Sequence, residues 1–292
     1  MPAPLPVRPA WLLVDGSSLI FRSFFGNKRD QRAPDGRSVN AVTGTLDSLA
    51  RLVESRRPRS LAIATDEDWR PAFRVEAMPS YKSHRVAEPV PPGLAPQMPL
   101  VMSVLAAIGL NVIGKPGYEA EDVIASLARR VDPPIEVYSG DRDLFAIIRD
   151  PDLVVLYPEK TGLAVVDEAG VEKRYGIPGR SYAEFAILRG DPSDGLPGVP
   201  GVGAKTAAGL VRRHKTLDGI LAGLDWSEAT RDYIARARRI VYPVEDLDLL
   251  DPTGGLPAEP ADPEALEKLN RELGIGSSSS RLLNALKAAG AG

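Results

Sequence analysis

The sequence predicts an α/β fold in which helices flank a central, mostly parallel β-sheet. Over the first two-thirds of the chain, short apolar runs alternate with longer amphipathic segments, and acidic residues directly follow several of the apolar runs. The chain has 292 residues, of which 43% are hydrophobic and 26% are charged, so it can bury a core without disulfides or a structural metal.

Six short apolar segments have the composition of strands. They are residues 11–14, 61–65, 111–114 and 135–139, and a hairpin-like pair at 153–157 and 163–166. Amphipathic patterns between them predict helices over residues 39–54, 96–108, 120–130 and 143–148. Residues 81–97 are rich in proline and carry a basic cluster, so we expect an exposed connection or lid there.

The character of the chain changes after residue 180, where we place the end of the first part, residues 1–180. A second part, residues 181–250, has a helix at 182–189, a glycine- and proline-rich stretch, and a helix at 204–214. The third part, residues 251–292, begins with a loop at 251–263. Two helices follow, at 263–273 and 280–288, and a run of glycine and serine separates them.

The composition excludes several kinds of chemistry. The chain has no cysteine and only two histidines, which excludes thiol nucleophiles, disulfides and a histidine-rich metal centre. Prolines interrupt residues 1–10 before any signal-like apolar segment forms, and no apolar run approaches the roughly 20 residues of a membrane span. We therefore expect a cytoplasmic protein, without a membrane contact, whose chemistry uses carboxylates, amines and hydroxyls.

Acidic residues lie just beyond three predicted strands. Asp15, Asp66, and the pair Asp141 and Asp143 each follow an apolar run. An aspartate after a strand is often only a turn former or a helix cap. Three parallel strands nevertheless deliver their carboxyl ends to one edge of a sheet, so the set predicts a single acidic site at that edge.

Two further acidic clusters extend this set. Glu119, Glu121 and Asp122 open a predicted helix, where acids also complement the helix dipole, and Asp191 and Asp194 precede the glycine-rich stretch, where they could form an ordinary turn. Nine carboxylates in one cleft require cations, because like charges raise one another's pKa. Oxygen ligands without Cys or His indicate Mg²⁺ or Mn²⁺, and two such ions are a known device for phosphodiester cleavage.

The glycine-rich residues 198–206 resemble a phosphate-binding P-loop only superficially. Ala204 separates the last glycine from Lys205, and no strand precedes the segment. We expect instead a helix-hairpin-helix, in which backbone N–H groups at the start of the second helix hold a DNA phosphate without reading sequence. A purely structural corner is the alternative. The nearby basic residues favour phosphate binding: Lys205, Arg212, Arg213 and Lys215.

A second basic patch lies near the predicted acidic cleft. It comprises Arg70, Arg74 and the cluster from Lys82 to Arg85, and contact with a substrate is as plausible for it as simple solvation. Arg22 could lie beside Asp15, and the aromatic residues around it suit a core.

Several motifs together resemble the bacterial 5′-3′ exonuclease and flap endonuclease family, which includes the N-terminal nuclease domain of DNA polymerase I. The segments that carry the resemblance, in the family's order, are 14–18 (VDGSS), 73–74 (FR), 81–85 (YKSHR), 117–122 (GYEAED), 139–144 (SGDRDL) and 189–203. The resemblance spans nearly the whole chain, and because no polymerase module follows, we expect a free-standing nuclease.

The resemblance implies a PIN-like sheet in residues 1–180 with a helical arch around 78–100, a helix-hairpin-helix subdomain in 181–250, and C-terminal helices that pack back on the nuclease core. It implies catalytic roles for Asp15, Lys82, Arg85 and Asp141. It implies that a first metal region is formed by Asp15, Asp66, Glu119, Glu121 and Asp122. The remaining acids would complete the site and hold a second ion: Asp141, Asp143, Asp191 and Asp194. The DNA contacts it implies are Arg22, Arg74, Tyr81, Lys82, Arg85, Gly198, Val199, Gly201, Gly203, Lys205 and Thr206.

By the same resemblance, the substrate is branched or flapped DNA with a free 5′ end, which is cut during replication and repair. The resemblance also implies a monomeric enzyme and a K⁺ ion bound at the hairpin. Three departures affect the site. Glu121 stands where the family usually has Asp, and Gly195 replaces an Asn and would loosen its turn. The spacing to Arg74 is one residue long, which leaves Asp68 as an alternative to Asp66. The alternatives are a DNA-binding module that uses only the hairpin and a PIN-like ribonuclease, which would lack residues 191–203 and the basic arch.

Overall fold

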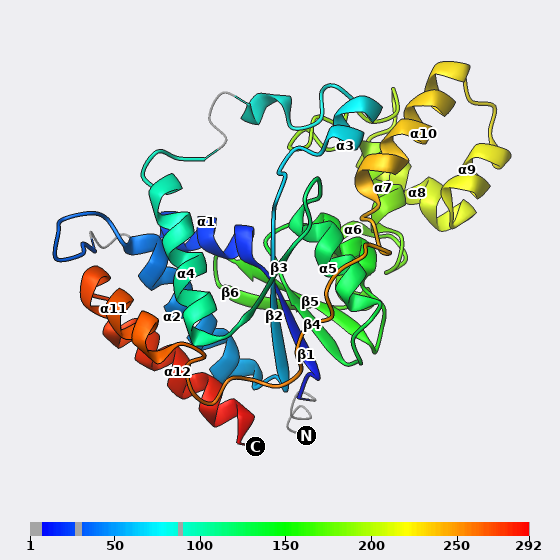
Figure 1. Ribbon diagram of the computed structural model, residues 1–292. Coiled ribbons are helices and arrows are strands. Elements are labelled where there is room, and N and C mark those ends of the chain that lie inside the picture. The colour runs from blue at the N-terminus through cyan, green and yellow to red at the C-terminus, as the bar shows by residue number, and fades with distance from the viewer. Residues whose placement is uncertain (1–7, 27–30, 87–89, 292) are drawn as a thin grey trace.

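The computed structural model describes residues 8–26, 31–86 and 90–291 and contains a six-stranded sheet between two groups of helices (Figure 1). The strands are β1 (Trp11–Asp15), β2 (Ser60–Thr65), β3 (Asn111–Gly114), β4 (Ile135–Tyr138), β5 (Leu153–Glu159) and β6 (Gly162–Val166). Their order is β3-β2-β1-β4-β5-β6, and only β6 runs antiparallel to its neighbour. The prediction of a mostly parallel α/β fold is confirmed.

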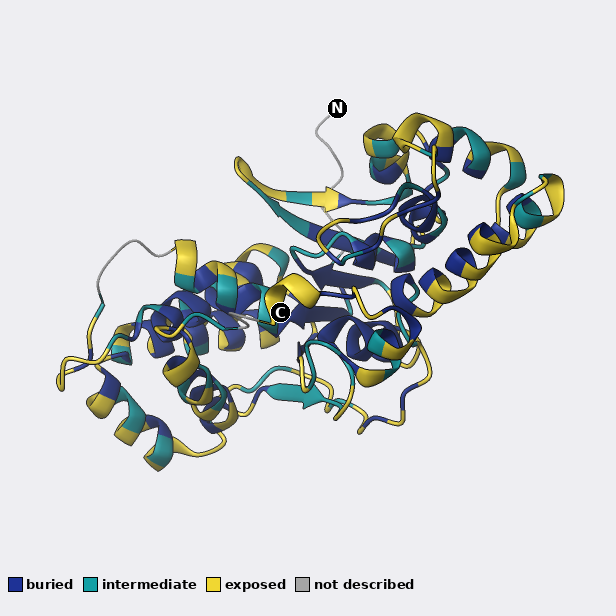
Figure 2. Ribbon diagram, turned by 90° about the horizontal axis from the view of Figure 1, so that it is seen from above, coloured by how far each residue is buried: buried dark blue, intermediate teal, exposed yellow. Residues whose placement is uncertain are grey.

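The central strands are buried on both faces, as the near-continuous apolar runs required. Alternate residues of β1 enter two separate cores: Leu13 packs in one cluster, and Leu12 and Val14 pack in the other. Figure 2 shows the buried strands in the middle of the molecule and exposed outer surfaces on the surrounding helices. Both faces of the sheet are therefore covered by packed side chains, and only its edges are left to bind a ligand.

One face of the sheet is covered by helices from both ends of the chain. They are α1 (Gly16–Gly26), α2 (Asn40–Arg56), α4 (Met98–Ile108), α11 (Pro263–Leu273) and α12 (Gly276–Gly290). The C-terminal helices lie beside α2 and α4 (Figure 1), so residues far apart in the sequence complete a single core.

The other face is covered by α5 (Ala120–Ala128) and the 3₁₀ helix η3 (Asp143–Ile147). Beyond them a group of helices extends away from the sheet (Figure 1). It comprises α6 (Glu168–Tyr175), α7 (Tyr182–Arg189), α8 (Ala204–His214), α9 (Leu217–Gly223) and α10 (Glu228–Val241). Tyr233 of α10 fixes the α7–α8 connection, because its hydroxyl accepts from Gly198 N at 3.0 Å and donates to Ile187 O at 2.9 Å.

The connection from β2 to α4 contains short elements only. They are α3 (Ala72–Ala77) and the 3₁₀ helices η1 (Ser83–Arg85) and η2 (Ala95–Gln97). Residues 87–89 of the expected arch lie outside the described residues.

Several element predictions were wrong or incomplete. The helix α1, directly after Asp15, was not predicted, and neither were α3, α6, α9 and α10. The segment 143–148 forms a 3₁₀ helix. The glycine-serine run does not separate the last two helices but forms the first turns of α12, because Ser279 is buried and its hydroxyl donates to Asn270 Oδ1 at 2.8 Å.

The packing of α12 gives a stability prediction. Leu286 is fully buried in the core shared with α2, so Leu286→Ala should lower the free energy of unfolding by about 2–5 kcal/mol through lost burial and a residual cavity. Thermal or denaturant unfolding measures this. Lys268→Ala, on the exposed face of α11, is the control and should change it by under roughly 0.5 kcal/mol. Equal stability of the two variants would show that α12 is not part of the folding unit.

Candidate active site

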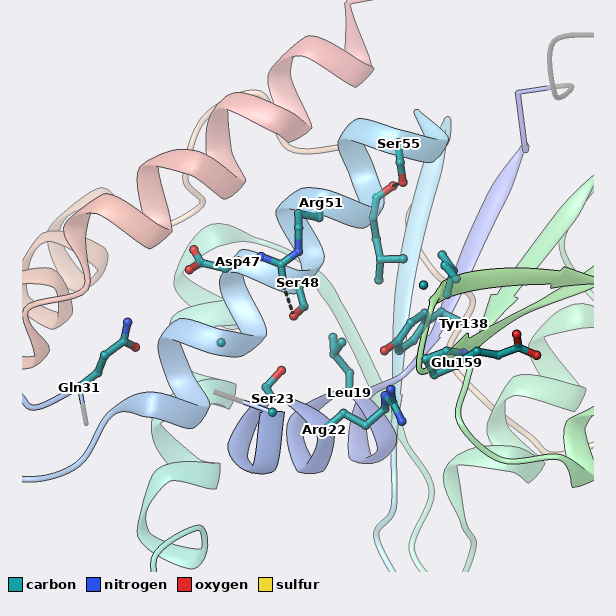
Figure 3. A pocket seen from close by; sticks show the side chains of 16 residues that line it. Leu19, Arg22, Ser23, Gln31, Asp47, Ser48, Arg51, Ser55, Tyr138 and Glu159 are labelled. Atoms are coloured by element: carbon teal, nitrogen blue, oxygen red, sulfur yellow. Dashed lines mark hydrogen bonds between the residues drawn. The ribbon is translucent and has the colours of Figure 1, made fainter. Parts of the chain in front are cut away.

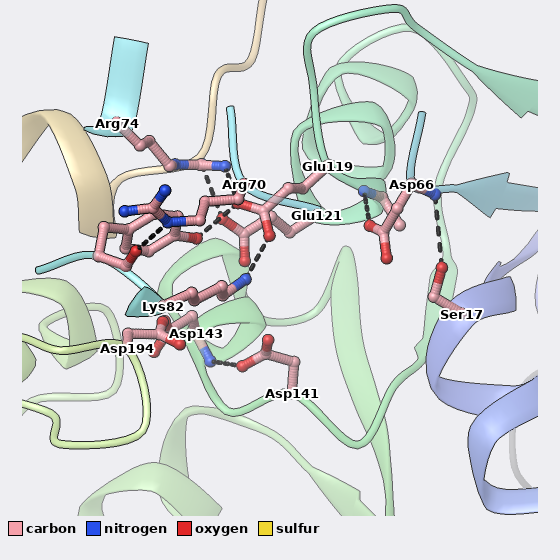
Figure 4. A network of polar contacts seen from close by, with 12 residues as sticks. Ser17, Asp66, Arg70, Arg74, Lys82, Glu119, Glu121, Asp141, Asp143 and Asp194 are labelled. Atoms are coloured by element: carbon pink, nitrogen blue, oxygen red, sulfur yellow. Dashed lines mark hydrogen bonds and ion pairs between the residues drawn. The ribbon is translucent and has the colours of Figure 1, made fainter. Parts of the chain in front are cut away.

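An acidic cleft of about 720 Å³ opens at the carboxyl ends of β1 and β4. These two strands are neighbours at the centre of the sheet, where the connections turn from one direction to the other, and such a switch point is the usual ligand site of an open α/β sheet. Eight carboxylates from several chain segments line the cleft: Asp15, Asp66, Glu119, Glu121, Asp141, Asp143, Asp191 and Asp194. Figure 4 shows most of them around Lys82.

Asp15 ends β1 and lies at the floor of the cleft. Its Oδ2 accepts from the Ser139 hydroxyl at 2.5 Å, and its Oδ1 accepts from Ser18 N at 2.9 Å. Burial, together with the nearby negative charge of Asp66, raises the pKa of Asp15 to about 7. The two hydrogen bonds therefore orient a carboxyl group that the fold alone leaves poorly compensated.

Asp141 and Asp143 lie on the turn after β4. Asp141 Oδ1 accepts from Asp143 N at 2.9 Å, and the Asp143 side chain lies close to that of Asp194. Burial and the charge of Asp194 raise the pKa of Asp141, and burial with the charges of Asp141 and Asp194 raises the pKa of Asp143 well above its usual range. Two segments about fifty residues apart thus crowd three like charges together, an arrangement that a cation would stabilise.

Asp191 is better compensated than these three. Its Oδ1 accepts from Ser193 N at 2.9 Å, and its Oδ2 lies 3.4 Å from an Arg189 nitrogen and 3.7 Å from an Arg142 nitrogen. Its carboxylate therefore also organises the loop that leads to α8.

The acids at the start of α5 divide between the cleft and the interior. Asp122 is fully buried, and both of its oxygens are engaged: Oδ1 by Arg74 and Val244 N at 2.7 and 2.8 Å, and Oδ2 by Arg74 and Glu119 N at 2.9 and 3.2 Å. Asp122 does not line the cleft, so the structure favours a structural role over direct metal ligation. Glu121 does line it, and the Arg74 guanidinium lies 2.7 Å from its Oε1.

Lys82 is the buried cation on the cleft side of this group. It forms an ion pair with Glu119, and its backbone takes the left-handed conformation, with φ of 45°. Burial alone would lower the pKa of the ammonium, but the charges of Glu119 and Glu121 raise it above its usual value, so Lys82 is charged at neutral pH. The Tyr81 hydroxyl donates to the same Glu119 carboxylate at 2.5 Å.

Asp66, rather than Asp68, faces the cleft. Asp66 Oδ1 accepts from Ala120 N at 2.7 Å, whereas Asp68 Oδ1 accepts from Arg70 N at 3.0 Å within its own loop. The extra residue before Arg74 is accommodated in this loop, so it does not displace the acid at the strand end.

The expected DNA contacts near the cleft separate into exposed and buried groups. Arg85 has an exposed side chain, donates to Ser193 O at 3.2 Å and lies 3.6 Å from Asp194 Oδ1. Arg74 and Tyr81 are 0% and 1% exposed, so they cannot reach DNA in this conformation. Arg22 projects from α1 into a different cavity.

Gly195 tightens its turn rather than loosening it, contrary to our expectation. Its φ is +75°, and a Cβ there would lie 2.1 Å from Ser80 O. Without a side chain, the loop packs directly on the segment that carries Lys82: Ser80 Oγ donates to Gly195 O at 2.8 Å, and Lys82 N donates to Asp194 O at 3.1 Å. This close approach places Asp194 beside the basic cluster.

The glycine-rich segment leaves one group of N–H donors available. Gly198 N donates to Tyr233 and Val199 N donates to Leu188 O at 2.9 Å, so neither is free for a ligand. Gly203 is the N-cap of α8 without a side-chain capping bond, and Gly203, Lys205 and Thr206 are exposed. The start of α8 can therefore accept an anion.

The donor chemistry of the cleft fits divalent metal ions such as Mg²⁺ or Mn²⁺. All candidate ligands are carboxylate oxygens, which hard cations prefer, and several are buried with raised pKa values. Within the part of the chain that the structure describes, no three acidic or histidine side chains already stand in position to share one ion.

Several residues of the cleft were missed from the sequence. Ser17, Ser18 and Ser139 donate or accept hydrogen bonds around Asp15 and Asp66, and Trp69 lines the opening. The serines directly follow or precede strand ends, a signal that was available. Nothing in the sequence pattern indicated Trp69.

Comparisons with known proteins agree with this architecture. The sequence matches family models described as the 5′-3′ exonuclease N-terminal resolvase-like domain, over residues 10–176, and the 5′-3′ exonuclease C-terminal SAM fold, over residues 177–260. A 5′-3′ exonuclease of Streptomyces coelicolor is 44% identical over 95% of this chain and 100% of that protein. One of Mycobacterium tuberculosis is 45% identical over 96% and 98%.

DNA polymerase I of Mycobacterium tuberculosis is 35% identical over 97% of this chain and 32% of its own length. Among solved structures, a bacteriophage T5 flap endonuclease has a TM-score of 0.64 at 16% identity, over 95% of this chain and 99% of that one. Flap endonuclease-1 of Methanococcus jannaschii has a TM-score of 0.61 at 17% identity, over 97% and 93%. The structural likeness at this identity concerns the fold.

An acidic cleft at the switch point of this fold, with sequence matches of this kind, defines a nuclease. The chain belongs to the 5′-3′ exonuclease family, since the two family models together cover residues 10–260 and two relatives match over nearly their whole lengths. The predicted resemblance is confirmed. None of the helices in the described residues has the length and apolar character needed to cross a bilayer.

The raised pKa of Asp15 predicts how the metal-free protein responds to pH. Because its folded-state pKa of about 7 exceeds the unfolded value near 4, its contribution favours folding below about pH 4 and is lost as the pH rises to about 7. In EDTA, Asp15→Asn should remove this loss and raise the free energy of unfolding at pH 7.5 by roughly 2–4 kcal/mol.

Urea unfolding between pH 4 and 8 measures this effect. Asp251→Asn, at a carboxylate that is 82% exposed, is the matched control and should follow the unmodified protein. If the free energy of unfolding of Asp15→Asn has the same pH dependence as that of the unmodified protein, the fold does not raise the pKa of Asp15.

Proposed function

We propose that this protein is a structure-selective 5′ nuclease that hydrolyses DNA phosphodiesters at branched or flapped duplexes with a free 5′ end. The observation that carries the proposal is the cleft, which eight carboxylates line together with the buried ammonium of Lys82. Such a cleft suits cations and, through them, a phosphate. The similar phage T5 flap endonuclease was solved in a complex with DNA and metal ions, and the catalytic core of Rad2 with a DNA substrate, which supports the same choice.

Two groups of acids would hold the divalent ions, Mg²⁺ or Mn²⁺. We assign Asp15, Asp66, Glu119 and Glu121 to a first region and Asp141, Asp143, Asp191 and Asp194 to a second. Bound there, two ions would supply an activated water and offset the charge on the scissile phosphate. Asp122, behind them, would hold Arg74 and the start of α5 in place.

Basic residues at the cleft would position the phosphate. Lys82, held by Glu119, presents a charged ammonium to the same cavity as the acids, and Arg85 adds a flexible guanidinium beside Asp194. Ser139 and Ser18 keep the Asp15 carboxyl group oriented. Preorganised charges of this kind stabilise charge that develops during the reaction.

The α7–α8 hairpin would hold the duplex away from the cleft. The exposed N–H groups at the start of α8 would receive a phosphate, with Gly201 allowing close approach and Lys205 and Thr206 beside it. A K⁺ ion bound by the hairpin carbonyls would strengthen the binding of the duplex. The hairpin belongs to residues 181–250, which also contribute Asp191 and Asp194 to a cleft otherwise lined by residues 1–180. The C-terminal helices of 251–292 complete the core beneath α2.

In the cell, a monomeric enzyme of this kind would remove 5′ ends and flaps during Okazaki fragment processing and DNA repair. The central test incubates the protein with a 5′-labelled flap duplex, a blunt duplex and single-stranded DNA, with Mg²⁺, Mn²⁺ or EDTA. We expect cleavage near the flap junction that requires a divalent ion. Activity in EDTA, or equal cleavage of all three substrates, would contradict the proposal.

Lys82 provides a test of the chemical step. Lys82→Ala should slow single-turnover cleavage by a factor that corresponds to roughly 2–4 kcal/mol, the scale of removing one preorganised donor, while flap affinity changes much less. Lys160→Ala, on the exposed turn of the β5–β6 hairpin, is the control. Weaker flap binding with an unchanged single-turnover rate would reassign Lys82 to substrate binding.

Gly201 provides a test of the hairpin. It has φ of +77°, and no protein atom lies within 4 Å of the position that a Cβ would take, so Gly201→Val projects a β-branched group into open space where DNA is proposed to approach. Affinity for flapped DNA should fall and its salt slope should flatten by about 0.9 for each lost phosphate contact.

Gly255→Val is the matched control, since Gly255 has φ of +89° and equally open surroundings. Fluorescence anisotropy over a salt series measures both variants. Loss of affinity in the Gly255 variant as well, or in neither variant, would argue that the hairpin is only a structural corner.

A further inference from the structure

A second cavity, of about 710 Å³, lies on the other side of α1 from the acidic cleft. Ser18, Phe21 and Phe25 of α1 line the cleft, whereas Leu19, Arg22 and Ser23 line the second cavity. Its other walls come from α2 and from the β4–β5–β6 edge of the sheet (Figure 3). The two cavities therefore share one helix but present different residues.

Two guanidinium groups give this cavity a positive character. Arg51 donates to Ser48 Oγ at 2.9 Å, and Arg22 lies beside the Tyr138 side chain. In the described residues neither arginine forms an ion pair. The carboxylates near them are engaged elsewhere: Asp47 with Arg281 at 2.8 Å, and Glu159 with Arg174 at 2.7 Å.

A buried hydroxyl without a partner lines the same cavity, one residue after Arg22 on α1. Ser23 is 6% exposed, lines the cavity, and its Oγ has no hydrogen-bond partner among the described residues. A buried polar group left unpaired usually costs about 1–3 kcal/mol, and a bound ligand is one way to satisfy it. Figure 3 shows Ser23 and Ser48 on facing helices on the same side of the cavity.

The remaining lining is apolar. Leu19, Leu52, Pro158 and Leu163 provide a surface on which a ring could pack. The volume is far larger than one inorganic phosphate needs and lies within the range of small-molecule sites. Two guanidinium groups without a carboxylate partner, the serine hydroxyls and an apolar wall together suit an anion with a planar apolar body.

We propose that this cavity binds a nucleotide, with its phosphate between Arg22 and Arg51 and its base on the apolar wall. The nucleotide is either a free mononucleotide or part of a DNA strand, since both present the same chemistry. Guanidinium pairs are well suited to phosphate, and Ser23 and Ser48 add hydroxyl donors. This site goes beyond the proposed function, because it lies outside the acidic cleft and needs no divalent ion.

Binding of a mononucleotide is measured by calorimetry with thymidine 5′-monophosphate, and with inorganic phosphate, in EDTA. Arg51→Gln and Ser23→Ala should each weaken nucleotide binding, Arg51→Gln at least tenfold, and phosphate alone should bind more weakly than the nucleotide. Arg271→Gln, with a side chain 70% exposed on α11, is the matched control. Circular dichroism confirms that each variant is folded.

A second titration separates the two sources of the nucleotide. Flapped DNA is titrated in EDTA by anisotropy with the unmodified protein and with Arg51→Gln. If the site takes a free nucleotide, Arg51→Gln loses thymidine monophosphate binding and keeps DNA affinity; if it takes a DNA strand, DNA affinity falls.

The proposal is overturned if neither ligand responds to Arg51→Gln, or if Ser23→Ala only stabilises the fold and leaves both affinities unchanged. Because no cleavage is measured, this outcome is distinct from failure of the proposed nuclease function.

Discussion

The buried guanidinium of Arg74 is the interaction on which the acidic side of the molecule depends. It is completely inaccessible and contacts Glu119, Glu121 and Asp122 at 2.5, 2.7 and 2.7 Å. These contacts join α3 to the start of α5, and Asp122 continues the connection to the backbone at Val244. Replacing one partner would leave an uncompensated buried charge, which is usually far more destabilising than the loss of an exposed ion pair. Arg74 therefore supports the wall of the cleft, although its own side chain does not line it.

The opposite side of the cleft has no comparable cation among the described residues. Asp141, Asp143 and Asp194 crowd together with raised pKa values for the first two, and Asp15 relies on two hydrogen bonds. The protein thus compensates its acids unequally: those around Arg74 and Lys82 are paired, and those after β1 and β4 are left to titrate or to bind a cation. Buried carboxylates with raised pKa values are typical of functional sites, and here they include Asp15, Asp141 and Asp143 at the ends of β1 and β4.

The sequence predicted what depends on local pattern. Strands with buried faces read as apolar runs, and the acids at their ends converged because parallel strands share an edge; Asp15, Asp66 and Asp141 all line the cleft. The burial of a side chain by residues far away in the sequence could not be predicted in the same way. Arg74 and Tyr81 belong to a basic segment whose composition suits an exposed surface, yet contacts with Glu119 forty residues away bury them. The Gly195 turn was misjudged because its tightness comes from the backbone at Ser80.

The loop from residue 190 to residue 203 links the acidic cleft to the exposed start of α8. Its beginning brings Asp191 and Asp194 into the cleft, and its end is the exposed start of α8. Between them, Gly190 and Gly198 pack backbone against backbone, where a Cβ on Gly198 would lie 2.5 Å from Arg189 O. Tyr233 fixes the same turn from α10. Such tight contacts leave little freedom for the acids to move relative to the hairpin. In the proposed nuclease, a duplex held at α8 would therefore meet the cleft at a fixed distance, so the site of cleavage would be set by DNA shape rather than by base sequence.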